Sequence, residues 1–419
     1  MKIEKLHQLY SERLLIDTDT RKIRKNSLFF ALKGDNFNGN KFAKEALTKG
    51  AAFAIIDEEE YLEGSNTILV ENVLGTLQKL ANYHRKQLKT PIIALTGSNG
   101  KTTTKELINA VLSTTYKTSA TVGNFNNHIG VPLTLLAMTK ETEICIVEMG
   151  ANHQKEIELL CSIAEPNFGY ITNFGKAHLE GFGSFEGVIK GKSELYDFLR
   201  KTKGKAFINE DDETQLKQAE GIEQIYFNNK TIKFISANPL VSVEFENTII
   251  ESQLIGKYNY KNISVAIAIG AYFNIPVATI KTAIENYVPK NNRSQIIQNK
   301  NNKIVLDAYN ANPSSMQAAL ENFSQLKDEH KIVILGDMFE LGVSSKTEHQ
   351  KIAELATSFN FNEVYLIGKA FSTTSVKNAF IFENFENFKS SVNFKSNINR
   401  TVLIKGSRGM ALERTLDLF

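Results

Sequence analysis

The sequence predicts an α/β protein built from three domains, and three observations lead to this expectation. A chain of 419 residues exceeds what one ordinary hydrophobic core accommodates. Short apolar runs alternate with segments of helical periodicity, which is typical of mostly parallel sheets covered by helices. One apolar run leads directly into a glycine-bracketed loop and then a helix, an order that creates a phosphate-binding site.

The first domain is expected over residues 1–88, as a small α/β unit. Thr90-Pro91 marks its end, because the residue before a proline disfavours helix and a new apolar run starts at once. Its candidate strands are residues 27–34, 51–58 and 66–70, and its candidate helices are residues 41–48 and 77–88.

The second domain is expected over residues 89–290, as a P-loop-type unit around a mostly parallel sheet. Residues 241–255 alternate in the manner of antiparallel strands and form a separate feature. The candidate parallel strands are residues 92–95, 144–150, 168–175 and 205–209, and the candidate helices are residues 105–112 and 259–273.

The third domain is expected over residues 291–419, as a second, Rossmann-like doubly wound unit. A short polar linker at residues 290–294 precedes it and suits a hinge. Its candidate strands are residues 303–310, 331–337, 363–368 and 401–407, and its candidate helices are residues 314–326 and 346–358.

The composition argues against several classes of partner. The 49 basic and 46 acidic side chains give a net charge of +3 without a basic arm, so neither nucleic acid nor a membrane surface is an expected partner. The only cysteines, Cys145 and Cys161, lie in apolar settings, which fits a reducing compartment. No apolar stretch of about 18 residues and no signal-peptide core is present, so we expect a cytoplasmic protein.

The strongest motif is PIIALTGSNGKTTTKELINAVL, from Pro91 to Leu112. Glycines allow a tight turn whose backbone N–H groups point at a phosphate, and the helix that follows adds its positive end. Lys101 would neutralise the outer phosphates and the Thr102 hydroxyl would hold Mg²⁺. The alternative is a turn with an incidental lysine. The expected ATP-binding loop comprises Gly97, Ser98, Asn99, Gly100, Lys101, Thr102 and Thr103.

Further polar residues follow other predicted strands. Glu148 ends an apolar strand, where an unpaired carboxylate is costly to bury and Mg²⁺ is a natural partner, although a solvated carboxylate is the alternative. Asn126 and Asn127 lie in a turn that either binds substrate or caps a helix. His178 and Lys192 are each, taken alone, more often structural residues.

Together these residues resemble the Mur ligases, a family of ATP-dependent amide-forming enzymes. The loop has the family's short form, with Leu95 where the usual phosphate loop has its first glycine, and the resemblance extends from Asp19 to Arg408. It implies ATP, two Mg²⁺ ions and CO₂, the last as a carbamate on Lys192. This chain reads Lys192-Ser-Glu where the family often has Lys-Gly-Glu, which leaves the lysine in place.

The resemblance also implies roles for individual residues. It places Lys101, Glu148, His178, Lys192 and Arg293 in catalysis, with Arg293 reaching the γ-phosphate when the domains close. Thr102 and Glu148 would bind one metal ion. His178 and the Lys192 carbamate would bind the other, with Glu148 as a further candidate ligand. Asn259, Asn262 and Asp307 would contact the nucleotide, whereas Tyr258 stands where the family commonly has histidine.

Three stretches resemble one branch of the family, which joins D-alanyl-D-alanine to UDP-N-acetylmuramoyl-tripeptide. They are DTDTRKIRKNSLFFALKGDNFNGNKF, DAYNANPSSM and GDMFELG. The implied reaction makes an acyl phosphate from the peptide carboxylate, and the dipeptide amine then displaces phosphate. The substrate-binding residues that this implies are Thr20, Arg21, Lys33, Asn126, Asn127, Asn310, Asn312, Lys405, Ser407 and Arg408.

Two alternatives remain at this point. One is a sister ligase, such as the diamino-acid-adding Mur enzyme or a folylpolyglutamate synthase, against which the Asn310-Ala-Asn312-Pro run speaks. The other is a nucleotide switch that uses the same loop without ligation. We expect a monomer, because the enzyme must open and close, and no residue run distinguishes lysine from diaminopimelate in the acceptor peptide.

Overall fold

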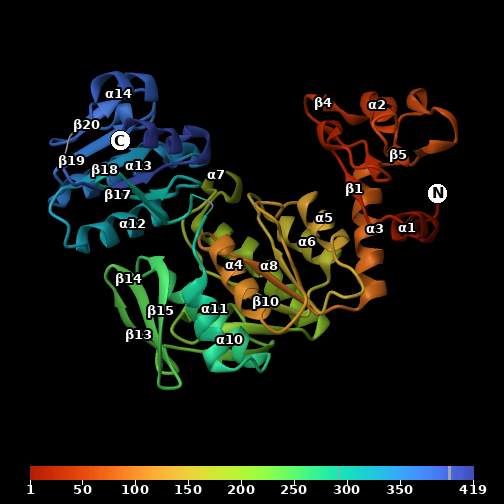
Figure 1. Cartoon of the computed structure of the whole chain (residues 1–419), viewed down its shortest axis with the longest axis horizontal. Helices are drawn as coiled ribbons and strands as arrows, with labels where there is room; N and C mark the ends of the chain where they lie inside the picture. The colour runs from red at the N-terminus through yellow and green to blue at the C-terminus, as the bar shows by residue number, and fades with distance from the viewer. Residues whose placement is uncertain (291, 395–397) are drawn as a thin grey trace.

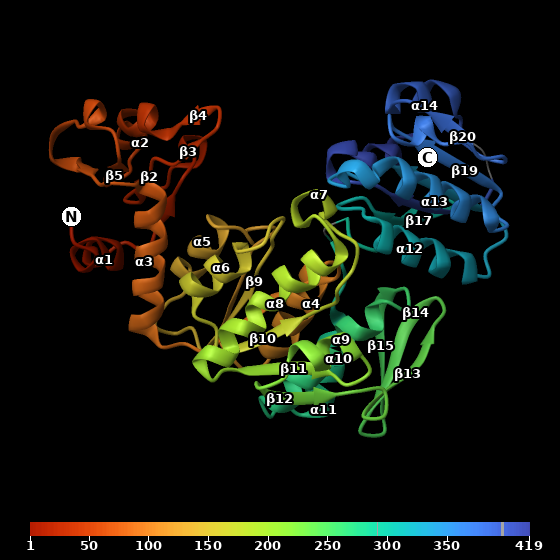
Figure 2. The ribbon, with the colours of Figure 1, turned by 180° about the vertical axis from the view of Figure 1, so that it is seen from behind.

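The computed structural model describes residues 1–290, 292–394 and 398–419. It confirms a three-domain α/β fold, with the N-terminal and C-terminal sheets at opposite ends and the central sheet between them (Figure 1). The view from behind shows the same order (Figure 2). The domain boundaries at residues 88/89 and 290/291 stay predictions, and Asn291 lies outside the described residues. Within the described ranges, no helix has the length and apolar character needed to cross a bilayer.

The N-terminal domain contains a four-stranded parallel sheet in the order β1-β2-β5-β6. Helix α3 starts four residues before its predicted position, because the Asn72 side chain accepts a hydrogen bond from the Gly75 N–H and caps it. The elements are α1 (Ile3–Ser11), β1 (Ile16–Asp17), β2 (Leu28–Phe30), β3 (Lys33–Gly34), β4 (Phe37–Asn38), α2 (Ala43–Thr48), β5 (Phe53–Ile56), β6 (Thr67–Leu69) and α3 (Val73–Leu88).

The central domain is built on a six-stranded parallel sheet in the order β12-β11-β10-β7-β9-β8. Its strands are β7 (Ile92–Thr96), β8 (Thr118–Ala120), β9 (Ile144–Glu148), β10 (Phe168–Ile171), β11 (Lys205–Asn209) and β12 (Glu223–Phe227). Its helices are α4 (Lys101–Leu112), α5 (Gly130–Leu136), α6 (Glu156–Ala164), α7 (Leu179–Phe182), α8 (Phe185–Thr202), α9 (Glu213–Gln218), α10 (Asn259–Tyr272) and α11 (Val277–Asn286). An antiparallel sheet is added by β13 (Ile232–Ala237), β14 (Leu240–Phe245) and β15 (Thr248–Ile255).

The C-terminal domain has a six-stranded sheet in the order β16-β17-β21-β18-β19-β20, parallel except for its edge strand β16. Its strands are β16 (Gln295–Asn299), β17 (Asn302–Asp307), β18 (Lys331–Gly336), β19 (Glu363–Ile367), β20 (Phe380–Phe382) and β21 (Thr401–Lys405). Its helices are α12 (Pro313–Gln325), α13 (Ser345–Ser358) and α14 (Phe385–Ser391), and the short 3₁₀ turn η5 spans Gly342–Ser344.

Most predicted strands are shorter in the structure than the sequence suggested, and two of them end beside the candidate site. The strand expected at residues 168–175 ends at Ile171, and the one expected at residues 144–150 ends at Glu148. In the first case Thr172 and Asn173 turn their polar groups to the loop after β7 instead of continuing the sheet. The shortening therefore creates contacts at the carboxyl edge of the sheet, where the candidate site lies.

Helix α3 joins the N-terminal domain to the central one. It packs on α1 on one side and on α5 and α6 on the other. Leu77 and Leu80 of α3 belong to the same buried cluster as Leu6 of α1 and Leu135 of α5. The N-terminal domain is thus attached through a continuous apolar contact. Each Å² of apolar surface that this contact buries stabilises the joint by about 25 cal/mol.

A histidine pair lies in this joint. His84 Nε2 is 3.0 Å from the carbonyl oxygen of Met138, so this nitrogen carries the proton, and His84 Nδ1 then accepts from His7 Nε2 at 3.0 Å. Burial lowers the pKa of His84, and burial together with the neighbouring His84 lowers the pKa of His7. The folded joint therefore favours the neutral form of both rings.

We expect this pair to make stability depend on pH. The unfolded chain takes up protons near the ordinary histidine pKa of 6.5, and the folded joint does so only at lower pH. The free energy of unfolding therefore falls as the pH drops through 6.5. Replacing His84 with Gln should reduce the fall in melting temperature between about pH 8 and about pH 5.5, measured by calorimetry. An equally steep fall in His84→Gln would show that other groups control it.

Candidate active site

The loop from Gly97 to Thr102 connects β7 to α4 and requires glycine at two positions. Gly97 has φ +138° and Gly100 has φ +78°, which L side chains rarely adopt. A Cβ on Gly97 would lie 2.0 Å from Thr172 Oγ1. The loop is held by the segment after β10, since the Ser98 N–H donates to the Asn173 carbonyl at 3.0 Å. The backbone thus has the tight turn that a phosphate loop needs.

Lys101, the first residue of α4, points back over this loop. Its Nζ donates to the Gly97 carbonyl at 2.7 Å. Burial lowers the pKa of the Lys101 amine, Glu148 opposes this shift, and the positive charge of Arg293 reinforces it. Two cations from different domains therefore act on one another here, and an anion between them would relieve their repulsion.

Glu148, at the end of β9, faces the first turn of α4. Its Oε1 accepts hydrogen bonds from Thr102 Oγ1 at 3.2 Å and from Asn126 Nδ2 at 2.8 Å. Glu148 is only 1% exposed, and its Oε2 is buried without a hydrogen-bond partner among the described residues. An orphaned carboxylate oxygen beside a hydroxyl fits a hard divalent cation.

Lys192, on α8, is fully buried. Its Nζ donates to the Ala151 carbonyl at 3.0 Å and lies 5.0 Å from the centre of the Phe182 ring. Burial, with the nearby charge of Lys101, holds the pKa of this amine well below its ordinary value. Glu194 instead accepts from the Lys155 N–H at 2.6 Å, at the start of α6. A neutral, nucleophilic amine is the form that combines with CO₂.

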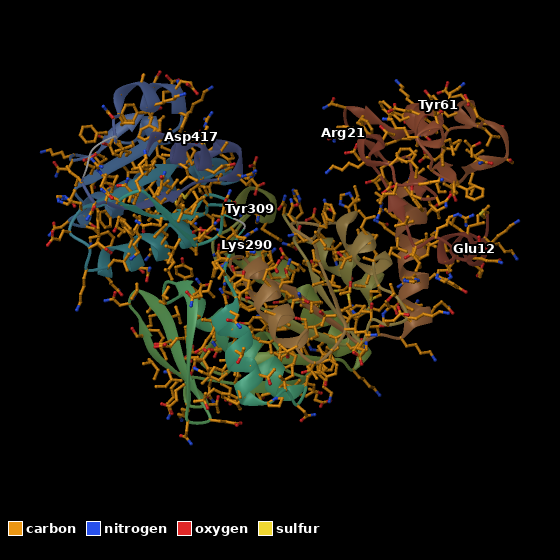
Figure 3. All side chains as sticks on the ribbon, in the orientation of Figure 1. Glu12, Arg21, Tyr61, Lys290, Tyr309 and Asp417 are labelled. Carbon is orange, nitrogen blue, oxygen red and sulfur yellow. The ribbon has the colours of Figure 1, made fainter. Side chains whose placement is uncertain are left out.

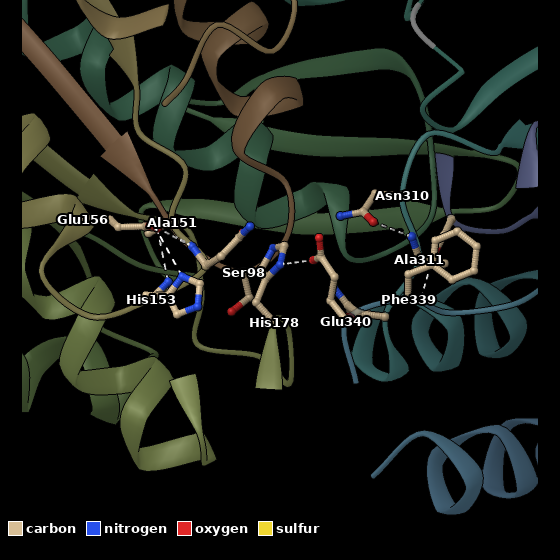
Figure 4. A network of polar contacts seen from close by, with 12 residues as sticks. Ser98, Ala151, His153, Glu156, His178, Asn310, Ala311, Phe339 and Glu340 are labelled. Carbon is tan, nitrogen blue, oxygen red and sulfur yellow. Dashed lines mark hydrogen bonds and ion pairs between the residues drawn. The ribbon is translucent and has the colours of Figure 1, made fainter. Parts of the chain in front are cut away.

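His178 precedes α7 and contacts the C-terminal domain. Its Nδ1 forms a hydrogen bond with Glu340 Oε2, and Figure 4 shows the two side chains facing each other. This contact lowers the pKa of the Glu340 carboxyl. The described residues contain no group of three His, Cys, Asp or Glu side chains that could hold a metal alone. A metal ligand set here would therefore need Thr102 or a modified Lys192.

The predicted nucleotide asparagines lie at the start of α10, beside α4. Asn262 Nδ2 donates to Asn259 Oδ1 at 2.8 Å, and Asn262 Oδ1 accepts from Thr104 Oγ1 at 3.1 Å. Asn259 Nδ2 donates in turn to the Ile255 carbonyl at 2.7 Å. This chain of bonds fixes both amides, with Asn262 next to Gly100, and both line the same cavity as the phosphate loop.

The C-terminal domain adds a polar cluster at the end of β17. Asp307 accepts from Lys405 Nζ at 2.5 Å and from the Ser294 N–H at 3.1 Å. Lys405 also donates to the Asn310 carbonyl at 3.2 Å. The guanidinium of Arg293 lies 3.9 Å from the centre of the Tyr309 ring. The hinge is therefore tied to the strand end that faces the phosphate loop.

The start of α12 reaches the phosphate loop directly. Asn312 Nδ2 donates to Asn99 Oδ1 at 2.7 Å, while Asn312 Oδ1 accepts from the Ser315 N–H and caps the helix. Ser314 Oγ accepts from the Lys176 N–H at 3.1 Å. These bonds join the Asn-Ala-Asn-Pro run to the nucleotide loop.

Most predicted site residues thus line one cavity of about 480 Å³ between the central and C-terminal domains. The lining also includes residues without a predicted role, among them Asn152, Tyr309 and Ser314. Tyr309 and Ser314 lie inside the DAYNANPSSM run, so that run was their signal. The predicted residues in the lining are Ser98, Asn99, Gly100, Lys101, Thr102, Thr103, Asn126, Glu148, His178, Asn259, Asn262, Arg293, Asp307, Asn310 and Lys405.

The other predicted residues lie outside this lining. Asn127 Oδ1 accepts from the Gly130 N–H and caps α5, the alternative that the sequence allowed. Ser407 Oγ accepts from the Phe339 N–H, and Arg408 pairs with Glu413 at 2.7 Å. Thr20, Arg21 and Lys33 lie in the N-terminal domain, with Arg21 labelled in Figure 3.

Pairings explain the positions of two of these N-terminal residues. Arg21 pairs with Asp19 at 2.7 Å, and Lys33 lies 2.9 Å from Asp57 and 2.7 Å from Glu58. Lys33 and Arg21 are both at least partly exposed and so remain accessible to a ligand.

Three family models match the chain in sequence order. The model described as "Mur ligase family, catalytic domain" matches residues 15–98, the Mur ligase middle domain matches residues 95–270, and the "Mur ligase, glutamate ligase domain" matches residues 292–408.

Known proteins are similar over nearly the whole length. A UDP-N-acetylmuramoyl-tripeptide--D-alanyl-D-alanine ligase of Bacillus subtilis is 35% identical, with 95% of this chain and 91% of that protein covered. A crystal structure of MurF from Acinetobacter baumannii superposes with a TM-score of 0.84 at 28% identity, covering 96% of this chain and 92% of that one. The structure of MurF ligase from Thermotoga maritima in complex with ADP superposes with a TM-score of 0.85 at 26% identity, covering 97% of this chain and 96% of that one.

Proposed function

The chain belongs to the Mur ligase family, and on this premise we propose the reaction that it carries out and the residues that perform it. It is an ATP-dependent ligase that adds D-alanyl-D-alanine to UDP-N-acetylmuramoyl-tripeptide, a step of peptidoglycan synthesis. The observation that carries this function is the contact of Asn312 with Asn99, because it places the branch-specific Asn-Ala-Asn-Pro run on the phosphate loop.

We propose that ATP lies across the cavity between the two domains. The backbone N–H groups of the loop and the start of α4 would hold its phosphates, and Asn259 and Asn262 would face the adenine. Arg293, whose charge already acts on Lys101, would meet the γ-phosphate. The planar guanidinium suits two phosphate oxygens at once.

The residues fit Mg²⁺ at one position. The orphaned Glu148 Oε2 and the adjacent Thr102 hydroxyl are oxygen ligands of the kind that this ion prefers. Mg²⁺, when bound, would neutralise charge on the transferring phosphoryl group. For the second ion the resemblance implies His178 and a carbamate on Lys192. His178 is held by Glu340 in this structure, so Glu340 would have to release it.

The chain's own residues then account for the two steps of the reaction. A carboxylate reacts with amines only after one of its oxygens becomes a leaving group, so it first attacks the γ-phosphate and forms an acyl phosphate and ADP. The dipeptide amine next attacks the acyl carbon and phosphate leaves. Lys101 and Arg293 would stabilise charge on the transferring group, and contact between the two domains would exclude the water that hydrolyses the acyl phosphate.

The N-terminal domain would hold the uridine nucleotide end of the acceptor. Thr20, Arg21 and Lys33 supply a hydroxyl and two cations there, and Asn126 lies nearer the reacting end because it bonds Glu148. We propose that a further group of residues acts on the peptide substrate, either by contacting it or by holding the start of α12. These residues are Asn310, Asn312, Lys405, Ser407 and Arg408. The proposed domain boundaries, residues 1–88, 89–290 and 291–419, follow this division of work.

The test is phosphate release by purified protein with ATP and Mg²⁺, with acceptor and dipeptide supplied separately and together. We expect phosphate, and a pentapeptide product identified by mass spectrometry, only when both substrates are present. Acceptors that carry lysine or diaminopimelate at the third position would determine that specificity. Turnover with a different amine would point to a sister ligase, and ATP hydrolysis independent of any acceptor would point to a nucleotide switch.

We also propose a monomeric, cytoplasmic enzyme. A monomer suits a chain whose domains must move relative to one another during the reaction. Light scattering on purified protein would test the mass, and fractionation of cells would test the location.

A further inference from the structure

We propose that Tyr309 is a positioning residue that holds the Arg293 guanidinium in the orientation needed to bind the γ-phosphate. This inference rests on the proposed function, because it takes Arg293 as the arginine that meets that phosphate. Tyr309 lies in the loop that follows β17, and Figure 3 labels it close to Lys290, where the chain enters the C-terminal domain.

The backbone on both sides of Arg293 is fixed by the two domains. Asn292 and Ser294 each have φ +50°, a left-handed conformation that costs free energy in non-glycine residues. Two contacts of Ser294 offset this cost: its N–H donates to Asp307 Oδ1 at 3.1 Å, and its Oγ lies 2.8 Å from Tyr258 OH. These contacts hold the backbone, but they leave the long side chain of Arg293 free to rotate.

The Tyr309 ring supplies the missing constraint on that side chain. The Arg293 guanidinium lies 3.9 Å from the centre of the ring, within the range of a cation–π contact. Its Nε is buried and has no hydrogen-bond partner among the described residues. Since no described residue competes with the ring by a hydrogen bond at that nitrogen, the ring contact is the interaction that orients the plane of the guanidinium.

The stacked arginine faces the phosphate loop rather than the solvent side of the hinge. Arg293 and Tyr309 both line the cavity that contains Lys101, and the charge of Arg293 acts on the Lys101 amine. Arg408 lies 6.0 Å from the same ring, but it pairs with Glu413 at 2.7 Å and is outside the cavity lining. Tyr309 therefore positions Arg293. Because the ring already restrains this side chain, Arg293 loses less conformational entropy when it binds phosphate.

The experiment compares the affinities of the whole enzyme for ADP and for β,γ-methylene-ATP, measured by calorimetry with Mg²⁺. Because ADP lacks the γ-phosphate, its affinity depends only on correct folding and on the parts of the site that contact the rest of the nucleotide. In Tyr309→Leu we expect the ratio of the two affinities, analogue over ADP, to fall by about 2- to 30-fold, the range of a cation–π contact. Tyr309→Phe keeps a ring face and should retain the wild-type ratio. Tyr309 is only partly buried, so both variants should fold.

The other results separate failure of this inference from failure of its premise. If Tyr309→Leu weakens both ligands equally, the ring contacts the shared part of the nucleotide or merely supports the fold, and the inference is wrong. An unchanged ratio in Tyr309→Leu, alongside a reduced ratio in Arg293→Ala, also overturns it while the role of Arg293 stands. If Arg293→Ala itself leaves the ratio unchanged, Arg293 does not meet the γ-phosphate and both proposals fall.

Discussion

Replacing Lys101 with alanine is expected to reduce ATP turnover and ligation by about 10³-fold or more, the loss typical of removing a charge that stabilises phosphoryl transfer. Lys101 starts α4 and its amine lies over the phosphate loop, bonded to Gly97. Among the described residues, no other lysine lines the cavity from the central domain, and Lys405 pairs with Asp307. Steady-state phosphate release with both substrates measures the effect.

The exposed Lys117, close to the far end of α4, provides a matched control for the loss of one positive charge. Lys117→Ala should keep its turnover, and a thermal melt should show that Lys101→Ala is folded. Near-normal ligation by a folded Lys101→Ala enzyme would contradict the proposed role of the loop.

The sequence predicted the nucleotide end of the site well because its signals are local. A glycine that needs positive φ, a lysine and a hydroxyl occur within six residues, and their geometry follows from one turn and one helix start. Glu148 was predicted for a related reason: a carboxylate directly after a buried strand has few partners except a cation.

Contacts between domains could not be predicted in this way. Asn99 and Asn312 are 213 residues apart, and His178 and Glu340 are 162 residues apart. No periodicity links such pairs, so the family resemblance implied a metal role for His178 but no protein partner. Tyr309 was missed because an aromatic residue beside an aspartate has no motif until the arginine that it contacts is placed in space.

Several of the strands that the sequence missed are edge strands. Strands β8, β12, β16 and β20 lie at the edges of their sheets and are largely half-exposed or exposed. An edge strand needs no continuous apolar run, so its pattern resembles that of a loop. The central strands β7, β9 and β18 are almost entirely buried, and the sequence indicated all three.

Replacing Lys192 with alanine is expected to lower the ligation rate by about 10²-fold or more, because it removes the proposed carbamate together with the metal ion that it would help to hold. Burial holds the pKa of the fully buried amine well below its ordinary value, which favours the neutral form that combines with CO₂. Short carboxylates such as formate or acetate should restore part of the lost rate, since they place an anionic oxygen in the space that the side chain leaves. Phosphate release with and without the added carboxylate measures this rescue.

Two comparisons make this prediction specific to the modification. Lys190 lies on the same helix but is exposed, so Lys190→Ala should keep its rate and gain nothing from added carboxylate. Enzyme equilibrated with ¹³C-labelled CO₂ should show a carbamate carbon resonance that is absent from Lys192→Ala. A resonance that persists in the variant would place the carbamate elsewhere, and an unaffected rate would mean that Lys192 serves only to donate its hydrogen bond to Ala151. If the rate falls without rescue and no resonance appears, the amine acts as a buried positive charge near Lys101, and the second metal site must be assigned to other ligands.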